Sequence, residues 1–469
     1  MLFSNLSFIF IFLPILMFIY FLVSQKRKNI VLLLASLVFY AWGGPVYVVL
    51  LFLSTVFNYF CGRDLEEKKE DPMRKKRSLV FGIVINLLIL GFFKYYVFLM
   101  ESINALVSAE LPYRELAVPI GISIYTLRAI SYLADIYRGE AAQAKFVDLA
   151  LYLGMFPQIS AGPVDRYVNI AGQLGKRPLS VRRFGNGAML FVCGLAKKVI
   201  LADSAGILQE QITGLQIGTF SVLTAWIGCA AFAFRFYFEL SGYADMAIGL
   251  GRMLGFDLQR NFYDPYASRS VTEFWKRWNS SLTLWVRAYI YEPLEKRVQE
   301  ASGRIWIILL TAMLTGFWYG AEWKFLWWGI YFGILLVLEH FVFGRALARF
   351  PKVIQHLYTV ITVFIGWTFF SAPDLGAALD YIGVMFGVGA SAPADAQALY
   401  FIYSHWLLLL LCVAGASAKG MWALRSVSDV LASVCGKRAS VCIVSIVVFM
   451  ISLAFLITGT ANAGLVIQF

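Results

Sequence analysis

Charged residues are scarce in this sequence. Only 14% of the 469 residues are Asp, Glu, Lys or Arg, whereas 60% are hydrophobic. Soluble domains carry about 25% charged and about 45–50% apolar residues. A chain of this composition has too little polar surface to cover a soluble globule, which excludes a soluble enzyme and indicates a membrane protein.

Histidine is rare and cysteine is never closely paired. The three histidines, His340, His356 and His405, are far apart in the chain, and no CxxC motif occurs. Metal sites need clustered ligands, so we expect no metal and no bound cofactor. Most of the cysteines lie in apolar runs, where we expect small buried side chains. The six are Cys61, Cys193, Cys229, Cys412, Cys435 and Cys442.

Long hydrophobic runs recur from end to end, without strand-like alternation. A bilayer core is about 30 Å thick and needs roughly 20 apolar residues per helix. We therefore predict an all-α, polytopic transmembrane bundle with about 11–13 membrane segments, counting re-entrant and interfacial helices. The candidate segments are 6–24, 78–100, 146–163, 217–238, 304–319, 323–343, 353–371, 399–416 and 439–459, with less even stretches at 30–61, 117–137 and 185–206.

The excess of basic residues predicts the orientation. The net charge is +12, and the basic residues lie in short loops between apolar runs. This is the pattern of cytoplasmic loops, so nucleic acid is not needed to explain it. Residues 26–28 and 63–77 are then cytoplasmic, and the N-terminus is outside. The first run is a retained anchor, and 30–61 crosses and returns at the Gly-Gly-Pro of 43–45.

The middle of the chain combines apolar surroundings with ionisable groups. We predict a single domain over 1–469, with residues 116–345 as its functional core. Charges in lipid are costly and normally face an interior cavity, so we expect a polar central funnel. Arg235 can pair with Glu239 one helical turn away. Lys197 and Lys198 fit either the cavity or snorkelling to the interface.

Five motifs occur in order through this region. They are PIGISIYTLRAISYLADIYRG (119–139), FPQISAGPVDRY (156–167), GLAKKVILAD (194–203), FELSGYADMAIGLGRMLGFDLQRNFYDPY (238–266) and SRSVTEFW (268–275). Their order and spacing resemble the membrane-bound O-acyltransferase family. The likeness is strongest to the branch that contains the alginate O-acetyltransferase membrane subunit and its peptidoglycan-acetylating relatives.

This resemblance implies an activity of the alginate or cell-wall glycan O-acetylation type. An acetyl or short acyl group would pass from a cytosolic thioester, such as acetyl-CoA, across the bacterial inner membrane. The acceptor would be an extracytoplasmic polysaccharide or a periplasmic or extracellular partner acetyltransferase. Segment 261–293 is aromatic and basic, typical of an interfacial helix. The resemblance adds that it forms the cytoplasmic floor of the funnel, where Lys276 and Arg287 meet the donor's phosphates.

The sequence departs from the family at its reaction centre. The family's histidine in a WHGA-like motif corresponds to Tyr319 in LTGFWYGAEW, and a second histidine corresponds to Asn279 in FWKRWN. We take Tyr319 and Asn279 as the candidate catalytic residues. Tyr319 is open to three roles: a base activated by Arg128 or Arg235, a nucleophile, or a hydrogen-bond donor to an oxyanion.

The remaining candidates line the predicted substrate channel. Arg128 and Arg235 stand at positions where the family has glutamine. Glu239 and Ala288 stand at positions where the family has aspartate. The channel set is Tyr243, Asp245, Ser241, Glu239, Arg235, Arg128 and Trp318. His340 lies 21 positions after Tyr319 in what reads as one continuous helix, about 30 Å away, so it does not substitute; His405 is a weaker candidate.

Two other functions fit the same residues. A catalytically silent scaffold or acyl conduit that supports a partner acetyltransferase would explain the missing histidine. A transporter would use the same charged cavity, but the sequence shows no inverted repeat that would support one.

Overall fold

The structure, a computed structural model, describes residues 2–68, 70–108, 111–417 and 437–458. Every regular element in these ranges is helical, which confirms the all-α prediction. The chain groups into two compact units: Met1–Phe191 with Met246–Gln259, and Val192–Asp245 with Arg260–Gln468. The predicted single domain and the central funnel stay predictions.

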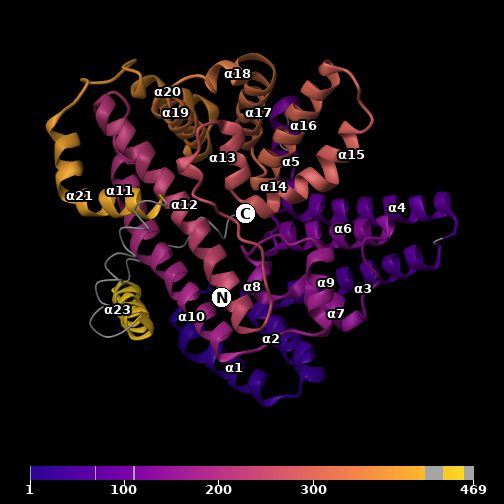
Figure 1. The fold of residues 1–469 in the computed structure, drawn as a ribbon. Helices are drawn as coiled ribbons and strands as arrows, with labels where there is room; N and C mark the ends of the chain where they lie inside the picture. The colour runs from indigo at the N-terminus through magenta and orange to yellow at the C-terminus, as the bar shows by residue number, and fades with distance from the viewer. Residues whose placement is uncertain (1, 69, 109–110, 418–436, 459–469) are drawn as a thin grey trace. The chain divides into compact units, whose positions relative to one another are not determined.

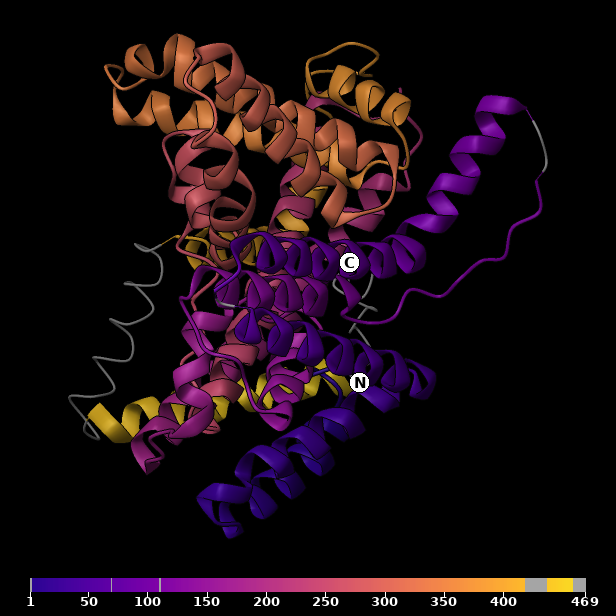
Figure 2. The ribbon, with the colours of Figure 1, turned by 90° about the vertical axis from the view of Figure 1, so that its right-hand side faces the viewer.

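The first unit is built from short and long helices. Helices α3, α4 and α6 pack against one another side by side (Figure 1). After α5, residues 111–119 form neither helix nor strand, and Figure 2 shows this connection as an extended trace. The helices are η1 (Phe8–Phe12), α1 (Leu13–Leu22), η2 (Gln25–Arg27), α2 (Lys28–Gly43), α3 (Pro45–Glu67), α4 (Pro72–Leu90), η3 (Gly91–Tyr95), α5 (Tyr96–Val107), α6 (Ile122–Arg138), α7 (Phe146–Gly154), α8 (Phe156–Ile159), α9 (Tyr167–Gly175) and α10 (Val181–Ala196).

Local sequence explains where helices of this unit begin and end. The predicted turn at 43–45 is confirmed, because α2 ends at Gly43 and α3 begins at Pro45, whose ring suits a first helical position. Asp71 caps α4 by accepting from the backbone N–H of Arg74 at 3.0 Å. The predicted span 146–163 is wrong, since the helix ends at Gly154 and the chain forms only the four-residue α8 afterwards, with Pro157 in its first turn.

The second unit contains a long helix, α12, which continues into the first unit. Around it lie a set of short helices over residues 265–295 and several long apolar helices. The elements are η4 (Lys197–Ala202), α11 (Asp203–Thr213), α12 (Val222–Met253), η5 (Pro265–Ala267), α13 (Val271–Arg277), α14 (Ser280–Val286), η6 (Arg287–Tyr291), α15 (Glu292–Glu295), α16 (Ala301–Tyr319), α17 (Trp323–Leu338), η7 (Glu339–Phe343), α18 (Gly344–Leu347), α19 (Lys352–Ser371), α20 (Leu375–Met385), α21 (Ala396–Gly415) and α23 (Lys437–Ile457).

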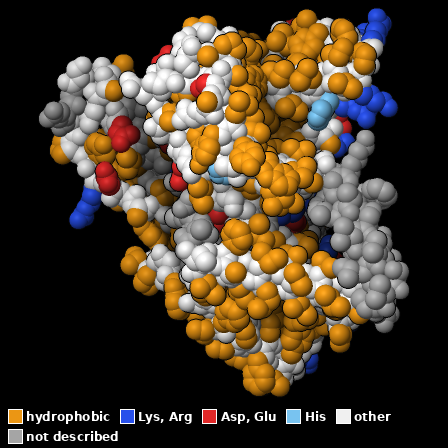
Figure 3. All heavy atoms as spheres, turned by 90° about the vertical axis from the view of Figure 1, so that its left-hand side faces the viewer, with side chains coloured by type: hydrophobic (Ala, Val, Ile, Leu, Met, Phe, Trp, Pro, Cys, Tyr) orange, Lys and Arg blue, Asp and Glu red, His pale blue; other side chains and the backbone are white. Residues whose placement is uncertain are grey.

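Eight helices within the described ranges are long and apolar enough to cross a membrane. One face of the molecule shows mainly hydrophobic side chains with few charges between them (Figure 3). Both observations support a multi-pass membrane protein, because exposed apolar surface of this extent suits lipid. The eight are Pro45–Glu67, Pro72–Val107, Val222–Met253, Ala301–Tyr319, Trp323–Leu347, Lys352–Ser371, Ala396–Gly415 and Ala439–Ile457.

Helices α16 and α17 form a tightly packed hairpin. A Cβ on Gly316 would lie 2.3 Å from the carbonyl oxygen of Phe325, so the two backbones approach too closely for any side chain there. The expectation of one continuous helix through this region is therefore wrong, since the chain turns at Gly320–Glu322. His340 nevertheless stays distant from the turn, about 25 Å along α17 and η7 from Trp323.

The prediction that most cysteines are buried is confirmed for some of them. Cys61, Cys229 and Cys412 are buried, whereas Cys193 and Cys442 are exposed. Cys435 lies outside the described residues. An exposed thiol on an apolar helix is compatible with a lipid-facing position, because cysteine behaves as a small hydrophobe.

Candidate active site

The two predicted catalytic residues are in contact. The Nδ2 of Asn279 donates a hydrogen bond to the phenol oxygen of Tyr319 at 3.1 Å, although 40 positions separate them. Tyr319 is the last residue of α16 and is only 2% exposed. The fold thus brings both positions where the resemblance implies histidine to one point inside the second unit.

The backbone around Asn279 fixes the direction of its amide. Asn279 precedes α14 with φ of 43°, in the left-handed region that asparagine tolerates better than most residues. Its carbonyl accepts the N–H of Thr283, which begins the helix. The next residue, Ser280, is tied by its N–H to the carbonyl of Asn261 at 2.8 Å and by its hydroxyl to the carbonyl of Arg260 at 2.7 Å. A β-branched residue at position 279 would strain this turn.

An aromatic shell surrounds Tyr319. Its ring meets the rings of Trp318, Trp328 and Phe370 edge to face, with centroids 5.2, 5.4 and 5.9 Å apart. Trp278, next to Asn279, is fully buried and packs against Trp367. Edge-to-face contacts of this kind stabilise and orient rings, so the phenol is held in one position. Trp318, a predicted channel residue, is therefore a direct neighbour of Tyr319.

The chemistry open to this pair differs from that of an imidazole. A neutral amide carries no proton that titrates near neutral pH, and an ordinary phenol has a pKa of about 10. The pair therefore offers hydrogen-bond donors and acceptors in a dry aromatic setting, where such bonds are strong. It suits orienting a hydroxyl or holding the oxygen of a developing oxyanion better than removing a proton.

Arg235 does not lie where the sequence suggested. The predicted pairing of Arg235 with Glu239 is wrong, because the guanidinium donates to Gln209 at 2.7 Å and to Glu210 at 3.1 Å, both on α11. Glu239 instead lies 3.9 Å from the ammonium of Lys198. Tertiary partners on a neighbouring helix thus replace the i,i+4 pair on α12.

Buried and partly buried ion pairs line one side of α12 in the second unit. Lys197 binds Asp245 at 2.7 Å, and Lys198 forms a short contact with Asp203. Lys198 is 2% exposed, so snorkelling is ruled out for it. Both lysines belong to the π-helical turn η4, a distortion that often marks functional sites. The sequence analysis placed Glu239 and Asp245 in the predicted channel and left the two lysines open, but it did not predict these ion pairs.

Gly242, in the Ser-Gly-Tyr motif of α12, permits this arrangement. A Cβ at this position would lie 2.7 Å from the carbonyl oxygen of Gly194 and 3.1 Å from the backbone nitrogen of Lys198. The two helices therefore touch backbone to backbone, which brings Lys197 within reach of Asp245. The flanking channel candidates Ser241 and Tyr243 are each 1% exposed.

Arg128 occupies a separate polar cluster in the first unit. Its fully buried guanidinium lies over the ring of Tyr152, 4.3 Å from the centroid. The Tyr152 hydroxyl donates to the backbone carbonyl of Asp165 at 2.9 Å, and the Asp165 carboxylate accepts from Gln158 at 2.7 Å. Burial raises the pKa of the Asp165 carboxyl to about 7, and the charge of Arg128 opposes that rise. Its role in a channel stays a prediction.

The predicted donor-binding residues are on the surface. Lys276 in α13 and Arg287 at the start of η6 are both exposed, and Arg287 pairs with Glu292 at 3.0 Å. Helices α13, α14 and α15 are each too short to cross a bilayer. His405 is bound locally at a kink in α21, where its Nδ1 lies 2.8 Å from the hydroxyl of Ser404.

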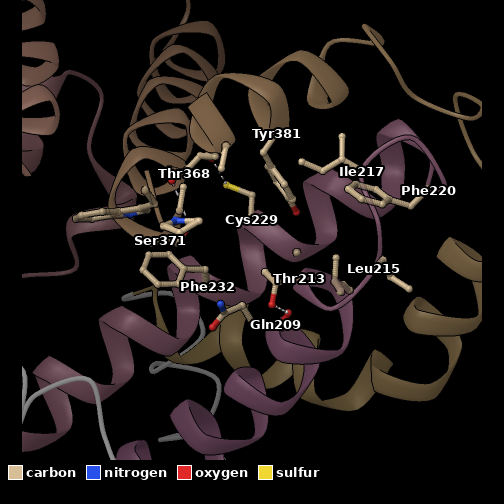
Figure 4. Close-up of a pocket in the computed structure, with 16 residues that line it drawn as sticks. Gln209, Thr213, Leu215, Ile217, Phe220, Cys229, Phe232, Thr368, Ser371 and Tyr381 are labelled. Atoms are coloured by element: carbon tan, nitrogen blue, oxygen red, sulfur yellow. Dashed lines mark hydrogen bonds between the residues drawn. The ribbon is translucent and has the colours of Figure 1, made fainter. Parts of the chain in front are cut away.

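A pocket of about 320 Å³ lies beside the aromatic shell of Tyr319. Figure 4 shows Gln209, Thr213 and Leu215 on one side of it and Thr368 and Ser371 on the other. Phe232 and Trp367 also line it, and both rings contact Phe370, which in turn contacts Tyr319. Successive ring contacts, from Phe232 or Trp367 to Phe370 and from Phe370 to Tyr319, therefore link the pocket wall to the phenol.

These features define an all-α, multi-pass membrane protein with buried polar clusters in its helical units. The profile of the "MBOAT, membrane-bound O-acyltransferase family" matches residues 114–376. The chain belongs to this family, which together with its acetyltransferase relatives identifies an O-acyltransferase.

Named relatives cover most of the chain. It is 36% identical over 394 residues to "Probable alginate O-acetylase AlgI" of Pseudomonas aeruginosa, covering 83% of this chain and 75% of that protein. It is 33% identical over 427 residues to a peptidoglycan O-acetyltransferase of Helicobacter pylori, covering 83% and 80%. A teichoic acid D-alanyltransferase of Streptococcus thermophilus is 26% identical over 237 residues, covering 47% and 56%.

Proposed function

We propose that this chain moves an acetyl or other short acyl group from a cytosolic acyl thioester, such as acetyl-CoA, across the bacterial inner membrane. The acceptor is an extracytoplasmic polysaccharide or a partner acetyltransferase that modifies one. The names of the relatives support this class of acceptor, since they act on alginate and peptidoglycan. Alginate and cell-wall glycans are therefore the first acceptors to test.

The contact between Asn279 and Tyr319 carries the proposal. Two residues that the family resemblance assigns to the reaction centre meet at 3.1 Å in a buried aromatic setting. We assign the Tyr319 hydroxyl to hydrogen bonding with the reacting oxygen and Asn279 to holding that hydroxyl. A preorganised donor in a dry site stabilises developing charge far better than one in water.

Charge along α19 supports a direction of transfer. Arg345 and Arg349 precede this helix and Lys352 is its first residue, whereas residues 353–418 contain no Lys or Arg. Under the positive-inside bias the start of α19 is cytoplasmic and its end extracytoplasmic. At 20 residues, about 30 Å, the helix is long enough to cross the bilayer core.

The pocket in Figure 4 suits the acceptor side. It lies at the end of α19 and is bounded by residues 213–220 and 371–373, which carry no basic side chain. Its hydroxyls are already bonded within the chain: Thr213 donates to the carbonyl of Gln209 at 3.1 Å and Ser371 to that of Thr368 at 3.3 Å. A pocket with satisfied hydroxyls and aromatic walls can hold the apolar face of a sugar or of a partner's side chain.

A second candidate is a catalytically silent acyl conduit for a partner enzyme. The observation that favours it is the same contact, because neither an amide nor an ordinary phenol accepts a proton near neutral pH. The two candidates make opposite predictions for the same substitutions.

The test is acyl transfer by the reconstituted full-length protein supplied with labelled acetyl-CoA. Tyr319→Phe is expected to lower turnover by about 100-fold or more. Tyr331→Phe is the matched control, since its hydroxyl is bonded to the carbonyl of Thr362 at 2.8 Å in the same unit. Turnover that appears only in Tyr319→His would overturn the enzyme proposal and favour the silent conduit.

A further inference from the structure

A polar pocket of about 580 Å³ lies in the second unit, apart from the Tyr319 site. The start of α13 forms one wall, and η7, α18 and the start of α19 form the other. Arg269 and Glu273 line it from the first side, and Glu339, His340 and Arg345 from the second. It shares no residue with the pocket beside Tyr319.

The acidic residues of this pocket already have partners. The two carboxylate oxygens of Glu339 accept the N–H groups of Val271 and Thr272 at 2.6 and 2.8 Å. Glu273 pairs with Arg277 at 2.6 Å. The oxygens of Glu339 are thereby satisfied, the charge of Glu273 has a cationic partner, and the first amides of α13 are no longer free to bind a ligand.

The arginines of the pocket differ from its glutamates. Arg269 and Arg345 are both exposed, and neither forms an ion pair with any residue in the described ranges. The backbone N–H of Arg269 donates to the carboxylate of Glu273 at 2.8 Å. Each guanidinium presents five N–H donors in a planar fork that matches the oxygens of a phosphate. Both guanidinium groups belong to residues that line the same pocket.

The surroundings of the pocket suit a position at a membrane surface. Val342, Phe350 and Val353 are 69%, 52% and 76% exposed on the same stretch of chain. Arg349 and Lys352 add positive charge beside them. Exposed apolar side chains interleaved with basic ones are typical of segments at the headgroup level of an anionic leaflet.

We propose that this pocket binds a phosphate group through Arg269 and Arg345. The phosphate belongs either to the headgroup of an anionic phospholipid or to a phosphorylated acyl-thioester donor such as coenzyme A. Both ligands present the same oxygens to the two guanidinium groups, and either would reach a pocket at the cytoplasmic surface. The proposal is independent of the role of Tyr319, which lies outside the pocket.

The test uses full-length protein in nanodiscs and two separate probes. In phosphatidylcholine discs, calorimetry measures the binding of coenzyme A. In discs of equal parts phosphatidylcholine and phosphatidylglycerol, native mass spectrometry measures which lipid the protein retains. The double variant Arg269→Gln/Arg345→Gln is compared with Arg349→Gln, an exposed arginine of the same segment that does not line the pocket.

Wild-type protein is expected to bind one of the two probes, and the probe that binds identifies the source of the phosphate. The double variant should lose about tenfold affinity per arginine, whereas Arg349→Gln should stay within about twofold of wild type. Should the double variant misfold, single Arg→Lys variants keep the charge but lose the fork and should bind several-fold more weakly. Binding of neither probe by wild type, or equal binding by the pocket variants, overturns the site.

Discussion

The side-chain amide of Asn279 reaches the phenol oxygen of Tyr319 at 3.1 Å, and both groups lie among the rings of Trp278, Trp318 and Trp328. Because the two residues share one hydrogen bond, their substitutions should not be additive. In a cycle of Asn279→Ala and Tyr319→Phe, we expect a coupling of about 1 kcal/mol in acyl turnover. The coupling is obtained from initial rates with labelled acetyl-CoA.

The control for this cycle pairs Asn279→Ala with Tyr331→Phe, whose hydroxyl bonds to Thr362 instead. That pair should be additive within about 0.3–0.5 kcal/mol. Equal coupling in both cycles would mean that Asn279→Ala acts through general loosening of the unit. The hydrogen bond would then have no specific part in turnover.

The pair of Lys197 and Asp245 is expected to be structural and functional at once. Lys197→Met leaves the carboxylate of Asp245 without its 2.7 Å partner and should cost about 3 kcal/mol of stability. The double variant Lys197→Met/Asp245→Leu should recover most of that loss, because no uncompensated charge remains. Thermal unfolding in detergent measures both effects.

Measuring acyl turnover separates the structural role of the Lys197–Asp245 pair from its role in the substrate channel. If Asp245 also lines the substrate channel, the double variant recovers stability while its acyl turnover stays low. Recovery of both properties together would remove Asp245 from the channel and leave it as a packing residue.

Sequence patterns predicted the all-α architecture and many of the apolar helices. The Gly-Gly-Pro turn between α2 and α3 and the placement of Tyr319 followed from local signals, because turn residues and motif order are carried by the chain itself. The hydrogen-bond partners of Arg235 could not be predicted from the sequence. An i,i+4 carboxylate was the only candidate that sequence offered, whereas α11 supplies Gln209 and Glu210 from 26 and 25 positions away.

Contacts between helices that are far apart in the sequence could not be predicted either, because local patterns do not specify them. Lys197 and Asp245 are 48 positions apart, and nothing in either neighbourhood specifies the other. The phosphate pocket likewise joins residues near 270 with residues near 345. Only packing of the helices brings such side chains together.

Gly242→Ala should destabilise the protein, although alanine is a better helix former than glycine. Alanine normally stabilises a helix interior by about 1 kcal/mol relative to glycine. Here the added methyl would lie 2.7 Å from the carbonyl oxygen of Gly194, which is backbone and cannot move aside cheaply. We expect a net loss of about 2 kcal/mol in thermal unfolding.

The matched substitution is Gly185→Ala on α10. A Cβ at Gly185 meets nothing within 4 Å, so only the helix propensity remains. This variant should gain up to about 1 kcal/mol. Similar losses at both glycines would show that close approach of the backbones is not the reason for Gly242.

The pocket of Figure 4 can be filled without touching Tyr319. Ala377 lines it from α20, and Ala377→Phe would occupy the space. We expect acyl transfer to a glycan acceptor to fall about tenfold or more, while hydrolysis of the acyl donor by water continues. The control is Leu379→Phe, a 53% exposed residue of the same helix. Loss of both reactions in Ala377→Phe would mean that the pocket does not serve the acceptor.

Asp395 should make stability depend on pH in the acid range. It caps α21, accepting the N–H of Ala398 at 2.7 Å and the hydroxyl of Thr224 at 3.3 Å. Burial tends to raise the pKa of its carboxyl, but these hydrogen bonds outweigh burial and hold the pKa below its usual value. The charged form therefore stabilises the fold above the unfolded pKa of about 3.9, and the contribution is lost as pH falls through the lower folded value.

Two substitutions separate the charge of Asp395 from its cap. Asp395→Ala removes the cap and should cost about 1 kcal/mol at neutral pH. Asp395→Asn keeps a capping oxygen, so its loss of stability relative to wild type should be smaller. That loss should persist down to about pH 4 and then shrink on further acidification. The control is Asp380→Asn, which removes the charge of an exposed aspartate on α20. If the loss of stability in Asp395→Asn grew toward acid pH, the argument for Asp395 would be wrong. Protonation of the native carboxyl can only reduce the difference in stability between wild type and this variant.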